Sequence, residues 1–190
     1  MAEKIMMIRH GEKPDETKGI HGVDEKGKQD ADELSVRGWQ RAGALVRLFV
    51  PREGSVHPAL AKPASLFAQR ATAHVESLRS EHTLLPLARY LGKTIDTSFH
   101  RDDKTKIAKA AISATGVVLI AWEHDCIPDI GAAITGRSDS CPDHWPDDRF
   151  DVVWVLDRNG ESEWKLTQVP QLVLAGDLSE VIAAKHRGQK

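Results

Sequence analysis

The stretch Ile5-Met6-Met7-Ile8-Arg9-His10-Gly11-Glu12-Lys13-Pro14 decides the fold and the place of the functional site. Its first four residues form an apolar run, which predicts a buried strand. In an open α/β sheet, ligands bind just beyond the carboxyl ends of the strands. Arg9 and His10 therefore stand where chemistry takes place in such a fold, and Gly11 lets the backbone turn close to a ligand.

The composition is that of an ordinary globular protein. The 190 residues fit one domain, 1–190, which is long enough to bury a sizeable core. Hydrophobic residues make up 41% of the chain and charged residues 28%, as in most soluble proteins. The formal net charge of −2 gives no general attraction for nucleic acid or for an anionic membrane. A site for anions therefore has to be a local cluster of basic residues.

The two cysteines, Cys126 and Cys141, form neither a Cys-x-x-Cys motif nor a disulfide framework, which fits a reducing compartment. The first predicted strand starts almost at the initiator Met, so we expect no signal peptide. No apolar run is long enough to span a bilayer. These features predict a cytoplasmic protein without a membrane partner, and nothing in the sequence indicates an oligomeric state.

Predicted strands and helices alternate along the chain. The polar segment 12–33 lacks apolar periodicity and predicts a long loop, and a helix follows that Ser35 caps and Pro51 closes. An Asn159-Gly160 turn predicts a type I′ hairpin that returns the last strand antiparallel at the sheet edge. Further strands are expected at 64–68, 94–97, 117–122, 150–156 and 164–174, and further helices at 84–91, 104–115, 128–136 and 178–186. This order predicts an α/β fold with a mostly parallel central sheet.

Basic residues follow three of the predicted strands. The first strand ends in Arg9 and His10, a loop beyond the second carries Arg79, and His124 follows the strand at 117–122. Because the carboxyl ends of parallel strands meet at one sheet edge, two arginines and two histidines together predict a pocket for a dianionic phosphoryl group. Arginine pairs with two phosphate oxygens and stays protonated, whereas a neutral histidine can attack phosphorus at pH 7. This set suffices for phosphoryl transfer without a metal or another cofactor.

These motifs, in this order, resemble the histidine phosphatase superfamily, also called phosphoglycerate mutase-like. The defining Arg-His-Gly stands at Arg9-His10-Gly11, and the Leu-(Ser/Thr)-x-x-Gly-x-x-Arg-Ala helix stands at Leu34–Ala42. The second arginine of the family, in a Ser-x-Arg-x-x-x-Thr setting, resembles Arg79, and its second histidine resembles His124. The resemblance spans about residues 5–156. It implies a single-domain, three-layer α/β/α fold.

The resemblance also implies a mechanism, that of a metal-independent phosphomonoesterase. His10 would attack phosphorus in line and form a phosphohistidine, which water then hydrolyses. Arg9, Arg79 and His124 would hold the phosphoryl oxygens through both steps. Covalent catalysis of this kind divides one hard displacement into two easier ones. The substrate would be a small-molecule phosphomonoester or a phosphoprotein.

Several residues are candidates for the one that donates a proton to the leaving group. Phosphoglycerate mutases have Glu-Ser and then Trp-Asn after Arg-His-Gly, and Glu12-Lys13-Pro14-Asp15 at this place argues against a mutase. The acid-phosphatase branch uses an aspartate directly after the second histidine, and Asp125 occupies that position. The alternative role for Asp125 is a helix N-cap. Rival candidates for the donor are Asp102, Asp103, Glu12 and Glu76.

Two other functions fit the same residues. A phosphohistidine phosphatase that acts on a protein releases a nitrogen leaving group, which needs less help from an acid, and the small chain fits this branch. The third function is that of a non-catalytic, phosphate-binding family member. Loss of activity normally substitutes the catalytic histidine or arginines, and all four basic residues are intact here. The loops at 12–33 and 137–148 would set the choice of substrate.

Overall fold

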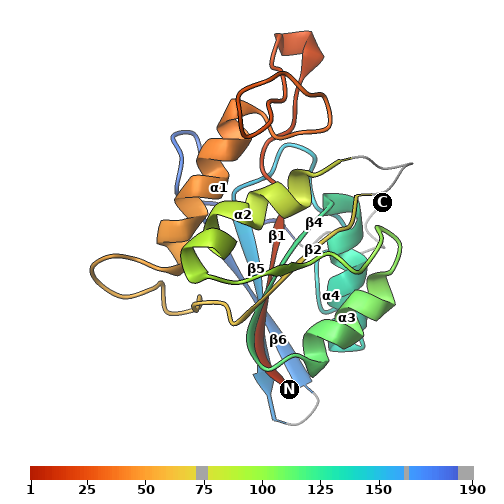
Figure 1. The fold of residues 1–190 in the computed structure, drawn as a ribbon. Coiled ribbons are helices and arrows are strands. Elements are labelled where there is room, and N and C mark those ends of the chain that lie inside the picture. The colour runs from red at the N-terminus through yellow and green to blue at the C-terminus, as the bar shows by residue number, and fades with distance from the viewer. Residues whose placement is uncertain (72–76, 161–162, 184–190) are drawn as a thin grey trace.

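A six-stranded sheet forms the centre of the computed structural model, which describes residues 1–71, 77–160 and 163–183. Across the sheet the order is β3-β2-β4-β1-β5-β6 (Figure 1). The four strands β3, β2, β4 and β1 run parallel, whereas β5 and β6 are antiparallel additions beyond β1. The strands are β1 (Ala2–Arg9), β2 (Ser65–Ala68), β3 (Ile95–Asp96), β4 (Gly116–Trp122), β5 (Val152–Asn159) and β6 (Glu163–Pro170). The predicted α/β class with a mostly parallel sheet is confirmed.

Two pairs of helices cover the two faces of this sheet, so the expected three layers are present (Figure 1). Successive strand residues point to opposite faces. In β1, Ile5 and Met7 therefore pack with α3 and α4, whereas Met6 and Ile8 pack with α1 and α2. The helices are α1 (Val36–Phe49), α2 (Arg79–Leu91), α3 (Lys104–Ser113) and α4 (Ile127–Thr135). None of them has the length and hydrophobicity that crossing a bilayer requires.

The start of α1 follows the sequence closely. The Ser35 side chain accepts a hydrogen bond from the backbone N–H of Gly38 at 3.1 Å, as an N-cap residue does. The helix ends at Phe49, just before Pro51. In α2, by contrast, the helix begins at Arg79 and runs through Pro86. The prediction of a helix from residue 84 was therefore one turn too short.

The last predicted helix, 178–186, is wrong for its described part. Residues 178–183 form no helix, and residues 184–186 lie outside the described chain. Side chains of β6 and of the residue before β5 bind the backbone groups that a helix would use. The backbone N–H of Leu178 donates to Asp151 Oδ2 at 2.7 Å, and the Gln168 amide binds both the N–H and the carbonyl oxygen of Ile182 at 3.0 and 2.8 Å.

The hairpin between β5 and β6 is confirmed, but the type I′ turn is not. A type I′ turn needs positive φ at both central residues, and Asn159 does not have it; Asn159 instead pairs with Glu163 as the last residue of β5. The final strand ends at Pro170 and not at residue 174, and the strand predicted at 150–156 runs from Val152 to Asn159. The observed bounds of β5 and β6 follow from their pairing, because the two strands stay hydrogen-bonded from Val152 and Pro170 up to the turn.

Candidate active site

The ends of β1 and β4 bring the predicted basic residues together. Arg9 and Trp122 are paired as the last residues of these two strands, and the backbone N–H of His10 donates to the Trp122 carbonyl at 3.1 Å. His124 lies two residues beyond Trp122, in the short 3-10 helix His124–Cys126. His10 and His124 thus leave neighbouring strands at the same edge of the sheet, as the motif order predicts.

His10 is buried and uncharged. Its ring Nδ1 lies 2.7 Å from the carbonyl oxygen of Gly11. A carbonyl only accepts hydrogen bonds, so Nδ1 carries the proton and Nε2 keeps its lone pair. Burial, together with the positive charges of Arg9 and Arg79, lowers the pKa of His10 to about 3, although the bond to Gly11 opposes the shift. The ring is therefore neutral at pH 7, as a nucleophile has to be.

The turn after His10 packs directly against α1 and α2. A Cβ placed on Gly11 would lie 2.9 Å from the carbonyl oxygen of Gly38 in α1. The backbone N–H of Gly11 donates to Thr83 Oγ1 at 2.7 Å, and this hydroxyl donates to the Arg79 carbonyl at 2.6 Å. The first turn of α2 is thereby tied to the turn that carries His10.

Arg79 opens α2 with a partly buried side chain. Its Nε and Nη2 donate to the backbone carbonyls of Glu33 and Ala31 at 3.2 and 2.9 Å, which holds the guanidinium against the end of the 12–33 loop. Burial lowers the pKa of Arg79, against the opposing effect of nearby carboxylates such as Asp32. Because its charge also lowers the pKa of His10, Arg79 belongs to the same electrostatic cluster.

Arg9 anchors a loop with one end of its guanidinium and leaves the other end free. Nη1 donates to the carbonyl of Asp147 at 2.5 Å and to those of Pro146 and Arg149 at 3.3 Å. The guanidinium also lies 3.8 Å above the centre of the Phe150 ring. Burial lowers the pKa of Arg9 to about 10, so the group stays charged at pH 7. Nε and Nη2 are buried and have no hydrogen-bond partner in the described chain.

The two ring nitrogens of His124 also differ in their contacts. Nε2 lies 2.8 Å from Asp147 Oδ1 and 3.1 Å from Asp125 Oδ1. Nδ1 is buried and has no hydrogen-bond partner in the part of the chain that the structure describes. Most buried polar atoms in proteins are paired. Nε and Nη2 of Arg9 are therefore donors with which the site can bind an anion. Nδ1 of His124 can join them only when the imidazole carries a proton on both nitrogens, because Nε2 contacts carboxylates that only accept.

Asp125 is no helix cap. The 3-10 helix has Glu123 at its N-cap position and α4 has Cys126, so the alternative role considered for Asp125 is wrong. Its side chain is 54% exposed, and Oδ2 lies 3.4 Å from Nη2 of Arg101. Asp125 therefore stands beside His124, at the mouth of the site and not in its interior.

The other candidate proton donors are positioned less favourably than Asp125 for protonating a leaving group. Asp103 accepts a hydrogen bond from the backbone of His100 at 2.9 Å, which together with a lysine ion pair lowers its pKa. Asp102 is 84% exposed and lies 3.6 Å from Arg101. Both oxygens of Glu12 are held by arginines. Glu76 lies outside the described residues.

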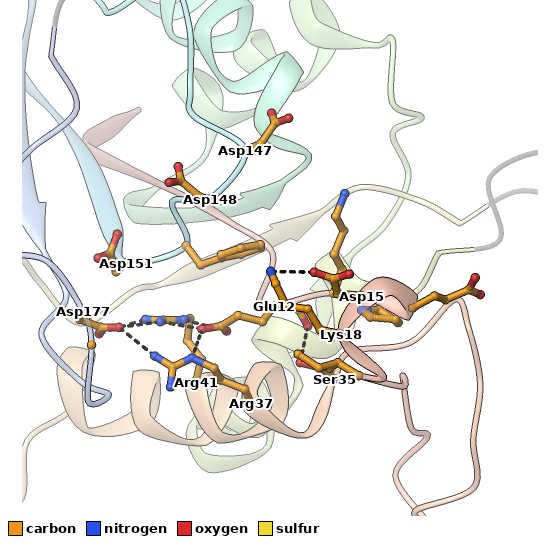
Figure 2. A pocket seen from close by; sticks show the side chains of 16 residues that line it. Glu12, Asp15, Lys18, Ser35, Arg37, Arg41, Asp147, Asp148, Asp151 and Asp177 are labelled. Carbon is orange, nitrogen blue, oxygen red and sulfur yellow. Dashed lines mark hydrogen bonds and ion pairs between the residues drawn. The ribbon is translucent and has the colours of Figure 1, made fainter.

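Arg41 connects the Arg-His-Gly-Glu turn with the C-terminal segment (Figure 2). Its Nε and Nη2 donate to the two oxygens of Glu12 at 3.0 and 2.8 Å, and Nη2 donates to Asp177 at 2.7 Å. Although burial favours the neutral form, hydrogen bonds with Glu12 and Asp177 raise the pKa of Arg41. Arg41 is 2% exposed, so this network is buried.

A cavity of about 700 Å³ lies beside these residues (Figure 2). The segment 12–20, the first turns of α1 and the loop at 147–151 form its walls. Phe150, which lines the cavity, stacks on Arg9, and Asp147, which also lines it, contacts His124. Asp147 was not predicted, because it stands in a polar loop without any motif.

One group of side chains in the described chain has the composition of a metal site. His124, Asp125 and Asp147 offer ligand atoms that all lie within 4.8 Å of one another. Nitrogen and carboxylate oxygen suit zinc and similar ions. The absence of a metal requirement therefore stays a prediction, which a chelator can test.

Comparison with known proteins gives structural matches alone. No family model matches the chain, and no curated protein matches it. The alpha-ribazole phosphatase from Shigella flexneri is 14% identical, with a TM-score of 0.54 over 86% of this chain and 94% of its own. The putative phosphohistidine phosphatase SixA from Agrobacterium tumefaciens is 16% identical, with a TM-score of 0.52 over 87% and 96%.

A mycobacterial glucosyl-3-phosphoglycerate phosphatase, solved with VO3, is similar to the same extent. It is 16% identical, with a TM-score of 0.54 over 86% of this chain and 97% of its own. These neighbours are histidine phosphatases of the phosphoglycerate mutase-like type. The fold that the sequence motifs imply is therefore the fold that the chain adopts.

Proposed function

We propose that the protein is a metal-independent phosphatase that hydrolyses phosphomonoesters through a phosphohistidine on His10. One observation carries the proposal: His10 is buried and neutral, with its Nε2 lone pair available, close to the Arg9 guanidinium, which retains two unpaired donors in the described chain. Phosphoryl transfer asks a protein mainly for positioning and for neutralisation of charge. This cluster supplies both.

In the first step, Nε2 of His10 attacks phosphorus opposite the ester oxygen. The N–P bond forms while the P–O bond to the leaving group breaks, and the electron pair of that bond goes to the leaving oxygen. Nε and Nη2 of Arg9 and the Arg79 guanidinium pair with the phosphoryl oxygens. The bond from Nδ1 to the Gly11 carbonyl stabilises the positive charge that the imidazole acquires on phosphorylation.

In the second step, water attacks the phosphohistidine from the side that the leaving group has vacated. The N–P bond breaks, its electrons return to Nε2, and inorganic phosphate leaves. In this proposal Asp125, whose Oδ1 lies 3.1 Å from Nε2 of His124, protonates the leaving oxygen first and takes a proton from the attacking water afterwards. The two steps together regenerate neutral His10.

A phosphohistidine phosphatase that acts on a protein is the second candidate. The observation in its favour is the exposure of Asp125, which is 54% accessible and contacts Arg101. A weakly shielded acid suits a nitrogen leaving group, which needs less protonation than an alkoxide. The fold is also shared with the putative phosphohistidine phosphatase SixA. As in the first candidate, His10 would receive the phosphoryl group.

A screen of phosphometabolites and phosphopeptides, each with the wild-type protein and with His10→Ala, tests the proposal. We expect turnover by the wild type and none by His10→Ala and, after a rapid quench of the wild type, protein-bound phosphate that is labile to acid and stable to base. His57→Ala is a matched control, because His57 is exposed in the segment before β2 and its side chain bonds only the backbone N–H of Ala59 in the described chain. Label that persists in His10→Ala would reject His10 as nucleophile. Tight binding without turnover would favour the non-catalytic alternative.

A further inference from the structure

The cavity beside the phosphoryl-binding residues is placed to hold the leaving group. The Phe150 ring, which lines it, lies 6.1 Å from the His10 ring between centroids. Asp147, also in its wall, bonds to His124. A phosphoryl group held by Arg9 and His10 would therefore direct its ester substituent into this space. The volume of about 700 Å³ is that of a typical binding site for a small organic molecule.

The floor of the cavity is polar but electrically balanced. Glu12 and Asp177 are paired with Arg37 and Arg41 (Figure 2). All four side chains are held in this network, so they contribute donors and acceptors without an excess of either charge.

Other lining carboxylates also have partners. Asp15 is paired with Lys18 at 2.8 Å, and Asp151 is paired with Arg149 at 2.7 Å. These two pairs likewise leave no net charge on the wall. The electrostatic character of the cavity therefore depends on the lining charges that have no such partner.

The remaining charges on the rim are mostly negative. Asp148 and Glu16 are exposed and make no ion pair in the described chain, and the Asp147 carboxylate is paired only with His124 among the described residues. Hydrogen bonding to His124 lowers the pKa of Asp147, so it is ionised at pH 7. Lys13 is the one lining cation without an ion pair to a described residue. The rim therefore carries three such carboxylates and a single ammonium group, that of Lys13.

The guanidinium of Arg9 lies next to the cavity, although Arg9 does not line it. Arg9 is 1% exposed, and its Nε and Nη2 have no hydrogen-bond partner in the described chain. The same guanidinium stacks on Phe150 and binds the Asp147 carbonyl, both in residues that line the cavity. The anion-binding end of the site and the anionic rim therefore adjoin, which suits a ligand with a phosphate at one end and a cation at the other.

We infer that the cavity takes a hydroxyl-bearing, positively charged leaving group, and that amino sugar phosphates are the substrate class. The inference rests on the proposed phosphatase function. The rim carboxylates attract the ammonium group and accept hydrogen bonds from hydroxyls, while Arg37 on the floor donates to them. An aromatic ring in the wall adds a favourable surface for a cation. The same rim repels a leaving group that carries a carboxylate.

Three sugar phosphates of nearly equal size test the charge preference. Glucosamine 6-phosphate carries an ammonium group, glucose 6-phosphate is neutral beyond its phosphate, and 6-phosphogluconate carries a carboxylate. Their inhibition constants against p-nitrophenyl phosphate hydrolysis should rise in this order, by about three- to tenfold at each step, because exposed charges interact weakly. The differences should shrink as salt is added.

Substitution of the two rim residues tests the cause of the preference. The double change Asp148→Asn with Glu16→Gln should bring the inhibition constants of the cationic and the anionic sugar closer together by about threefold or more. Glu3→Gln is the matched control, because Glu3 is exposed near the start of β1, at the opposite end of that strand from Arg9. Glu3→Gln should leave the ratio of these two inhibition constants at its wild-type value.

The inference and the proposed function fail in distinguishable ways. Equal inhibition by the three sugars, a preference for 6-phosphogluconate, or no inhibition at millimolar concentration would overturn the inference while p-nitrophenyl phosphate is still hydrolysed. Absence of any hydrolysis would overturn the proposed function. In that case calorimetric titration of the same three compounds measures the order of affinities directly, and the same order is required for the inference to stand.

Discussion

Gly11 and Gly38 bring the turn that carries His10 into backbone contact with α1. A Cβ on Gly38 would lie 2.4 Å from the carbonyl oxygen of Glu12, closer than two such atoms can approach, and one on Gly11 would lie 2.9 Å from the Gly38 carbonyl oxygen. The two glycines belong to two separate sequence motifs. Their contact explains why the Arg-His-Gly turn and the glycine of the following helix occur together.

Gly38→Ala should therefore damage both stability and activity. The added methyl group would have to displace backbone, and overpacking of this kind costs about 1–3 kcal/mol. Gly43→Ala, in the same helix, is the control, because a Cβ there meets nothing within 4 Å. It should stabilise the protein by about 0.5–1 kcal/mol, the usual gain for this change within a helix. Urea unfolding of the two variants measures the difference, and equal stabilities would contradict the close contact.

The low pKa of His10 predicts a specific dependence of stability on pH. In the unfolded chain His10 binds a proton below about pH 6.5, whereas in the folded protein it does so only below about pH 3, because it is buried among positive charges. Between these values the unfolded state binds more protons, so stability rises with pH. At pH 5 the native state should lose about 2 kcal/mol relative to pH 7 on account of His10.

Comparison of variants isolates this contribution. The change in unfolding free energy between pH 5 and pH 7, obtained from urea titrations, should be smaller in His10→Ala than in the wild type by about 2 kcal/mol. His144→Ala should show the wild-type pH dependence, because His144 is exposed. An unchanged pH dependence in His10→Ala would mean that His10 titrates normally in the folded protein.

Arg41 is expected to be essential for stability. Arg41→Met would leave the Glu12 and Asp177 carboxylates without their main partner, and loss of one member of a buried ion pair costs about 3–5 kcal/mol. Arg47→Met, two turns later in α1, removes only an exposed side chain beside Tyr90 and should cost less than about 1 kcal/mol. Thermal or urea unfolding compares the two. A small effect at Arg41 would show that the network contributes little.

The sequence predicts the scaffold and the basic cluster because local signals specify them. The apolar runs of β1 and β4, the Ser35 cap and the Arg-His-Gly turn are each readable within a few residues. The topology then brings the ends of β1 and β4 together, since these strands are neighbours in a parallel ladder. His10 and His124 could therefore be placed near each other before any coordinates were known.

The remaining features depend on contacts between distant segments. Asp147 reaches His124 because Arg9 binds three carbonyls of its loop, and carbonyls are present at every residue, so no side-chain pattern marks them. No local pattern marks Arg41 as buried, because its partner Asp177 comes 136 residues later. The segment after Leu178 has helix-forming residues, but hydrogen bonds from the sheet override that preference.

Chelation should leave activity unchanged. Arg9 and Arg79 are both charged at pH 7 and can neutralise the phosphoryl oxygens without an ion. The group formed by His124, Asp125 and Asp147 makes the test informative, because its ligand atoms lie within 4.8 Å of one another. Activity in excess EDTA, compared with activity in added Mg²⁺ or Zn²⁺, is the measurement. Loss in EDTA with recovery by one of these ions would replace the metal-independent mechanism.

Asp125 is expected to be the general acid. Of the two carboxylates that contact His124, Asp147 has its pKa lowered by that hydrogen bond and is therefore a poor proton donor. An alkoxide leaves only with a proton, whereas p-nitrophenolate leaves without one. Asp125→Asn should accordingly slow hydrolysis of alkyl phosphates by about 10²–10⁴-fold and affect p-nitrophenyl phosphate far less. Asp129→Asn, exposed in the first turn of α4 and paired with Lys104, should leave both rates unchanged. Equal loss on both substrates, or no loss on either, would remove Asp125 from this role.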